Sequence, residues 1–159
     1  MSAEFDRLLP TLVQGGVEFI LIGGVAAIIH GSARLTYDVD VVYARTSVNF
    51  KRLAETLKPY APYLRGAPPG LPFAFDERTI RNGLNFTLST KLGDLDLLGE
   101  VTGGGSYQHL VPHSLEVQAF GVRFRCVNLA TLIKLKRAAG RPKDLESLAE
   151  LQTLFEDQR

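Results

Sequence analysis

The chain of 159 residues, 45% of them hydrophobic, predicts one domain over residues 1–159 that can bury a core of its own. Its 18 lysine and arginine residues nearly balance its 17 aspartate and glutamate residues, which excludes a strong overall attraction to nucleic acid or to an anionic membrane. The single cysteine, Cys126, excludes an intrachain disulfide, and no segment resembles a signal peptide or a membrane span, so we expect a cytoplasmic protein without membrane contact.

Helical and extended patterns alternate in the first third of the chain, which is typical of an α/β layered domain. Pro10 should kink or shorten the first helix, and Thr46 or Ser47 can cap the third. The expected helices and strands are, in chain order, Ala3–Gln14, Phe19–Ile22, Val25–His30, Asp38–Tyr43 and Ser47–Pro59.

After an irregular, proline-rich loop over residues 61–72, the chain returns to strands and then to helices. Two β-hairpins are expected, with the strand pairs Asn85–Thr90 and Asp94–Glu100, and Leu115–Ala119 and Val122–Val127. Asn128 can cap a helix over Leu129–Ala139, and Pro142 opens a last helix with leucines at helical spacing. The sequence thus predicts an α/β (α+β) fold, with a mixed β-sheet flanked by helices and a C-terminal helical pair.

Two acidic residues share one face of the second expected strand. Side chains alternate across a strand, so Asp38 and Asp40 point to one side while Val39 and Val41 enter the core on the other. Like charges held this close repel each other unless a cation lies between them, and Mg²⁺ prefers carboxylate oxygens. The pair therefore predicts a site for Mg²⁺ or Mn²⁺.

Gly23 and Gly24 follow the buried strand that precedes this acidic pair. A glycine turn that leads into a helix presents backbone N–H groups and a helix dipole, both of which favour phosphate. An Asp-x-Asp pair alone is common on protein surfaces, but this context predicts a nucleotide site in which Gly23 and Gly24 contact the phosphates.

A second acidic pair, Asp94 and Asp96, follows in the first hairpin. We place Asp94 in the turn, because Gly-Asp is typical turn chemistry. Asp96 lies between two leucines inside the strand, where a carboxylate without a partner would be costly. Asp96 is therefore the third predicted metal ligand, beside Asp38 and Asp40.

The segment Leu21–Val42, with Gly23-Gly24 followed by Asp38-Val39-Asp40, resembles the signature of the nucleotidyltransferase superfamily. The later segments Leu95–Leu98 and Leu132–Leu145 resemble its small bacterial branch, which includes minimal nucleotidyltransferases and toxins of AbiEii-type abortive-infection systems. The resemblance implies a mixed sheet with flanking helices and two divalent ions held by three acids. It also implies transfer of a nucleoside monophosphate from a triphosphate to an acceptor.

Basic residues near the C-terminus are candidates for contact with the nucleotide, or they merely coat a helix. The group consists of Lys134, Lys136, Arg137, Arg141 and Lys143. By resemblance, Lys136 matches a lysine near the nucleotide, and Asp144 matches the acid of a Lys/Arg-Asp pair. The further acid of that branch is Ser147 here, which leaves a catalytic duty for Asp144 open.

Other polar residues give weaker signals. Arg34 and Thr36 precede the acidic pair and either reach a phosphate or fix the loop; we include Arg34 in the predicted nucleotide site. His30, His109 and His113 are not predicted ligands, since Pro112 separates the last two and spoils a helical ligand pair. Cys126 is expected to be a buried thiol without a catalytic role, and Gly103–Ser106 a flexible loop that borders the active cleft.

The leading hypothesis is a metal-dependent nucleotidyltransferase with an NTP substrate and a protein or RNA acceptor, in a toxin-antitoxin or phage-defence setting with a cognate partner. The alternatives are a catalytically silent, nucleotide-binding regulatory module and a plain structural partner. The presence of all three acids favours an active enzyme.

Overall fold

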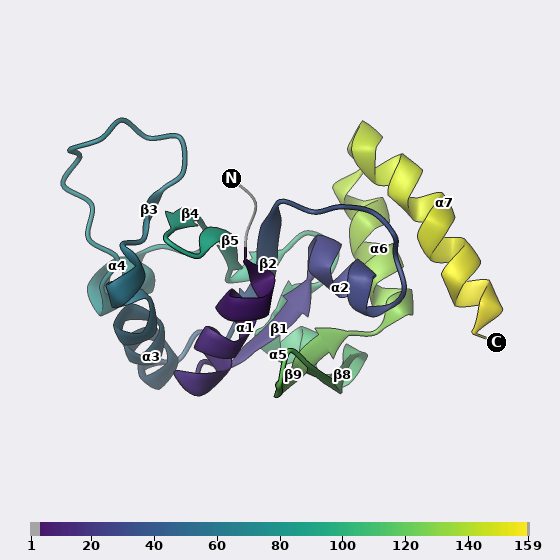
Figure 1. Ribbon diagram of the computed structural model, residues 1–159, viewed down its shortest axis with the longest axis horizontal. Coiled ribbons are helices and arrows are strands. Elements are labelled where there is room, and N and C mark those ends of the chain that lie inside the picture. The colour runs from purple at the N-terminus through teal and green to yellow at the C-terminus, as the bar shows by residue number, and fades with distance from the viewer. Residues whose placement is uncertain (1–3, 159) are drawn as a thin grey trace.

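The computed structural model describes residues 4–158 and contains a mixed β-sheet flanked by helices (Figure 1). The helices of this part of the chain are α1 (Phe5–Gln14), α2 (Gly23–Ile29), α3 (Ser47–Leu57), α4 (Glu77–Asn82), α5 (Tyr107–Leu110), α6 (Leu129–Ala139) and α7 (Pro142–Asp157). The strands are β1 (Phe19–Ile22), β2 (Asp38–Tyr43), β3 (Tyr63–Leu64), β4 (Phe86–Thr90), β5 (Gly93–Leu98), β6 (Glu100–Val101), β7 (Gly105–Ser106), β8 (Ser114–Ala119) and β9 (Val122–Val127). Short 3₁₀ turns follow α3 and α5.

The main sheet has seven strands in the order β3-β4-β5-β2-β1-β9-β8, while β6 and β7 form a separate pair. The central strand β2 pairs antiparallel with β1 and parallel with β5. The hairpins β4–β5 and β8–β9 extend the sheet on either side. The predicted mixed sheet and C-terminal helical pair are confirmed.

The core lies where the apolar faces of these elements meet. In β2 and β5, Val39, Val41, Leu95 and Leu97 are fully buried, as the alternating pattern requires. Side chains of α1 and α3, such as Leu9 and Leu53, are fully buried in the same core. At the other end of the molecule α6 packs against α2 and α7 (Figure 1).

Local caps explain where several helices begin. The Thr46 side chain accepts a hydrogen bond from the Asn49 amide at the start of α3. The Asn128 side chain accepts one from the Thr131 amide at the start of α6. Gly140 ends α6 in the left-handed conformation, with φ 64°, which suits glycine. Pro142 opens α7 as expected.

Several boundaries differ from the sequence-based expectation, most by one or two residues. The helix α2 begins at Gly23 rather than Val25, and the described part of α1 continues through Pro10 to Gln14, whereas Ala3 lies outside the described residues. The loop over 61–72 contains β3, which pairs with β4 at the edge of the sheet. Thr90 pairs with Gly93, so the turn is Lys91-Leu92 and Asp94 belongs to β5. None of the helices within residues 4–158 has the length and apolar character needed to cross a membrane.

Candidate active site

The parallel register of β2 and β5 brings four aspartates together on one face of the sheet. Asp38 is the partner of Asp94, and Asp40 is the partner of Asp96, while the valines and leucines between them enter the core. The placement of Asp94 in a turn was therefore wrong. Because Gly93 closes the turn with φ 103°, the strand starts one residue earlier and Asp94 shares the face of Asp96.

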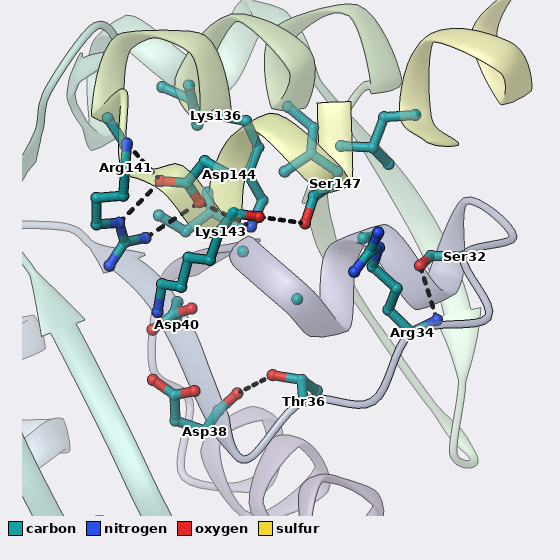
Figure 2. A pocket seen from close by; sticks show the side chains of 18 of the residues that line it. Ser32, Arg34, Thr36, Asp38, Asp40, Lys136, Arg141, Lys143, Asp144 and Ser147 are labelled. Atoms are coloured by element: carbon teal, nitrogen blue, oxygen red, sulfur yellow. Dashed lines mark hydrogen bonds and ion pairs between the residues drawn. The ribbon is translucent and has the colours of Figure 1, made fainter. Parts of the chain in front are cut away.

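Three of these acids lie close enough to share one metal ion. Carboxylate oxygens of Asp38, Asp40 and Asp96 all lie within 4.8 Å of one another, and all three side chains are half-buried. Figure 2 shows the carboxylates of Asp38 and Asp40 near each other at the start of β2. A cluster of carboxylate oxygens at this spacing could hold a divalent cation.

The charges of this cluster disfavour full ionisation. Burial, a hydrogen bond with Asp96 and the negative charges of Asp38 and Asp96 raise the pKa of Asp40 to about 9. Burial and contact with Asp96 also raise the pKa of Asp38. The cluster thus favours a bound proton or cation, and a divalent metal would meet that demand while leaving the acids ionised.

The two glycines at the start of α2 leave room for neighbouring side chains. A Cβ atom on Gly23, whose φ is +71°, would lie 2.2 Å from Asp40 Oδ2. A Cβ atom on Gly24 would lie 2.5 Å from Thr36 Oγ1. Glycine at these positions lets the backbone approach the acid and the loop before β2, and both glycines line the adjacent cavity.

A cavity of about 710 Å³ opens beside the acids, a size that suits small-molecule ligands. The sheet supplies Asp38, Asp40 and Asp96. The C-terminal helices and the turn between them supply Lys136, Arg141 and Lys143 (Figure 2). Lys143 extends from α7 towards Asp40 in this view, and its positive charge, like that of Arg65, partly opposes the rise in the pKa of Asp38 that burial and Asp96 cause. These three cations, which we call the basic wall, face the three acids of the sheet, although α7 also brings Asp144, Glu146 and Glu150 to the cavity. Carboxylates suit a metal ion and cations suit phosphate.

Asp144 anchors the basic wall. Its side chain is 1% exposed, and its carboxylate accepts a hydrogen bond of 2.8 Å from Arg141 Nε and lies 3.6 Å from Lys136 Nζ. Burial would raise the pKa of Asp144, but the hydrogen bond and charge of Arg141 and the charge of Lys136 outweigh burial and lower it. Asp144 therefore holds Lys136 and Arg141 in place at the cavity.

We expect Asp144→Asn to lower the thermal midpoint at neutral pH, because Arg141 and Lys136 lose their buried partner, at a cost of about 1–3 kcal/mol. The pKa of Asp144 is lower in the folded protein than its ordinary value of 3.8, so the ionised carboxylate stabilises the folded state. This stabilisation is complete above the ordinary pKa and is lost as the pH falls through the lower, folded-state pKa. The difference between Asp144→Asn and wild type should therefore shrink in melting curves recorded down to about pH 3. Glu116→Gln, in an exposed pair with Arg123, is the control and should melt like wild type throughout.

The loop before β2 is tied to α7. Glu150 accepts hydrogen bonds from the Ser32 hydroxyl at 2.6 Å and from the Ala33 amide at 3.2 Å. Arg34, a predicted nucleotide contact, lines the cavity but lies 3.8 Å from both Glu146 and Glu150. Thr36 donates a hydrogen bond of 3.2 Å to the Asp38 carbonyl, which fixes the approach to β2 (Figure 2).

The histidines, Cys126 and the glycine-rich segment do not line the cavity beside the acids. His30 lies at the end of α2, with Nε2 2.7 Å from the Val127 carbonyl, and Cys126 is buried with its pKa raised to about 12 by burial. Gly103–Gly105, His109 and His113 line a second cavity of about 680 Å³, and none of them lines the first. Of the basic residues, Lys134 lines that second cavity.

The sequence analysis did not identify an arginine that lies in ionic contact with the acidic cluster. Arg65, which directly follows β3, places Nη2 2.9 Å from Asp96 Oδ1 and Nε 3.4 Å from Asp94 Oδ2. No sequence motif marks Arg65, because the pairing of β3 with β4 brings it to the site from a proline-rich loop.

No protein-family model matches the chain, and no curated protein matches it either. Among solved structures, it is similar to the lincosamide antibiotic adenylyltransferase LnuA in its lincomycin-bound form, with a TM-score of 0.62 and 14% sequence identity. The similarity covers 95% of this chain and 96% of that chain. Identity this low shows the fold alone, so the chain has a nucleotidyltransferase-like fold.

Proposed function

We propose that this chain is a metal-dependent nucleotidyltransferase, which transfers a nucleoside monophosphate from an NTP to a hydroxyl acceptor. The observation that carries the proposal is the set of three carboxylates, Asp38, Asp40 and Asp96, which line a cavity and whose oxygens lie within 4.8 Å of one another. The nucleotidyltransferase-like fold supports this reading.

In the proposed reaction the acceptor oxygen bonds to the α-phosphorus, the bond to the β-phosphate breaks, pyrophosphate leaves, and the hydroxyl proton passes to solvent. Asp38, Asp40 and Asp96 would hold Mg²⁺ or Mn²⁺, which neutralises the charge that develops on the phosphates. Lys136, Arg141 and Lys143 would bind the phosphates from the opposite wall. Gly23 and Gly24 would let the phosphates approach the backbone, and Arg34 would lie at the rim of the nucleotide site.

The chemical class of the acceptor is a further part of the proposal. We infer a protein or an RNA end, in a toxin-antitoxin or phage-defence setting with a cognate partner, as the resemblance to the AbiEii-type branch implies. The fold neighbour LnuA is an adenylyltransferase of lincosamide antibiotics, which makes a small hydroxyl compound a further acceptor class to test.

A second candidate function is a nucleotide-binding regulatory module without turnover. One observation favours it: Arg65 lies in ionic contact with Asp96 and so occupies part of the space around the third acid. A module of this kind would bind NTP through the basic wall but would not release pyrophosphate.

Labelled transfer separates these two functions. We expect label from one or more α-³²P-labelled NTPs to appear, with Mg²⁺, in the protein, RNA or small-molecule fraction of a cell lysate incubated with the purified protein. Asp96→Asn should reduce this transfer to background, because it removes a shared ligand.

Sensitivity of the labelled product to protease, to ribonuclease or to neither identifies the acceptor class. NTP binding without label in any fraction would contradict the transferase and support the regulatory module. Equal transfer by wild type and Asp96→Asn would instead show that the acids are wrongly assigned.

A further inference from the structure

Arg65 is held rigidly beside the acidic face of the sheet. Its amide donates a hydrogen bond of 3.0 Å to the Thr87 carbonyl, which continues the pairing of β3 with β4. Its side chain donates a hydrogen bond of 2.8 Å from Nη2 to the Leu88 carbonyl and is 27% exposed. The guanidinium is therefore fixed by the backbone of β4 as well as by the acids.

The contact between Arg65 and Asp96 is ionic. The two atoms lie 2.9 Å apart, yet within residues 4–158 neither Asp96 Oδ1 nor Arg65 Nε makes a hydrogen bond, although both are inaccessible to solvent. A buried carboxylate oxygen without a directed donor is costly, and such an atom in a cluster of acids is a ready ligand for a cation. Arg65 supplies a positive charge to Asp96 Oδ1 but does not donate a well-oriented hydrogen bond to it.

Arg65 differs from the other cations near the site. In the described part of the chain it is the cation that lies within 4.0 Å of one of the three clustered acids, whereas Lys136 pairs with Asp144. Asp94, the fourth acid on this face, holds Arg65 Nε at 3.4 Å and so anchors the guanidinium between two carboxylates of β5.

Building on the proposed metal site, we propose that Arg65 is the resident counter-ion of the cluster and competes with divalent metal for Asp96. A guanidinium in contact with a ligand carboxylate repels an incoming divalent cation and occupies one of the oxygens that the cation needs. The metal-free site is thereby stabilised and its metal affinity is lowered. Metal then binds best together with nucleotide phosphates, whose negative charge offsets the guanidinium.

The test is a titration with Mn²⁺ alone, in which free Mn²⁺ is measured by electron paramagnetic resonance and no nucleotide is present. Arg65→Gln should bind Mn²⁺ roughly tenfold more tightly than wild type, because the competing charge is gone. Arg65→Lys retains the charge and should stay within about twofold of wild type. Arg81→Gln removes an exposed arginine paired with Glu77 and should not change the affinity.

Two further variants keep the result interpretable. If Arg65→Gln does not fold, Arg65→Gln/Asp94→Asn is compared with Asp94→Asn, and the double variant should again bind Mn²⁺ more tightly. Asp40→Asn should lose Mn²⁺ binding, which establishes that the titration reports the proposed site.

Unchanged or weaker Mn²⁺ binding after loss of the Arg65 charge, with binding still lost in Asp40→Asn, overturns this inference and leaves the proposed function standing. Binding that survives in Asp40→Asn, or no binding in wild type and Arg65→Gln alike, overturns the metal site and the inference with it.

Discussion

Asp40→Asn should abolish nucleotide transfer and, in metal-free buffer, should raise the thermal midpoint of the protein. Asp40 is half-buried beside Asp38 and Asp96, so its neutral replacement relieves repulsion among three carboxylates while it removes a proposed metal ligand. Each kcal/mol of relief corresponds to a rise of about 2–4 °C for a chain of this size. Added Mg²⁺ should stabilise wild type but not the variant.

The stabilisation by Asp40→Asn should depend on pH. Burial, together with Asp96 and Asp38, raises the folded-state pKa of Asp40 from 3.8 to about 9, so ionisation of this carboxyl disfavours the folded state as the pH rises between these values. Asparagine does not ionise, and its advantage in the melting midpoint should therefore be larger at about pH 8 than at about pH 5.

Asp76→Asn is the matched control, because Asp76 is an exposed N-cap of α4 and asparagine caps helices equally well. It should keep wild-type transfer and a wild-type response to Mg²⁺. A midpoint of Asp40→Asn that falls in metal-free buffer would contradict the repulsion that we infer for the cluster.

Gly23→Ala should also abolish transfer, and it should lower stability strongly. The new Cβ atom would lie 2.2 Å from Asp40 Oδ2 and 2.9 Å from Asp40 Cγ, so the Asp40 side chain or the start of α2 must move. The left-handed φ of +71° adds a cost of about 1–2 kcal/mol for any residue with a Cβ. Transfer assays and melting curves in metal-free buffer check both effects.

Gly121→Ala separates the steric effect from the backbone effect. Gly121 has a similar φ of +79° in the turn between β8 and β9, but a Cβ atom there would meet nothing within 4 Å. Gly121→Ala should lose only the stability that the left-handed backbone conformation costs a residue with a Cβ, and it should keep its transfer activity. If both alanine variants were equally active and equally stable, the close approach of Gly23 to Asp40 would have no functional meaning.

Most of the fold could be predicted because its elements carry local signals. The alternation of aspartate and valine in β2 placed Asp38 and Asp40 on one face, and the leucines around Asp96 placed it inside a strand. Asn128 and Pro142 marked the beginnings of α6 and α7 for the same reason, since capping is chemistry between near neighbours in the chain.

The parts that could not be predicted depend on pairings between distant segments. Asp94 was assigned to a turn because Gly93-Asp94 is typical of turns, whereas the register with β4 and β2 places it in β5. Arg65 lies in a proline-rich loop, and only the two-residue strand β3 brings it to Asp96. Charge content alone could not separate Lys136 and Lys143, which line the first cavity, from Lys134, which does not.

The two walls of the cavity are made at very different times during protein synthesis. The acids Asp38 and Asp40 leave the ribosome before the other residues of the two walls. Asp96 follows after α3 and α4, and Lys136 and Lys143 follow after the second hairpin. Translation adds about 5–20 residues per second, so several seconds separate the first acid from the last lysine. A growing chain therefore carries an incomplete site, and nucleotide cannot guide its folding until β2 and β5 have paired and α7 has docked.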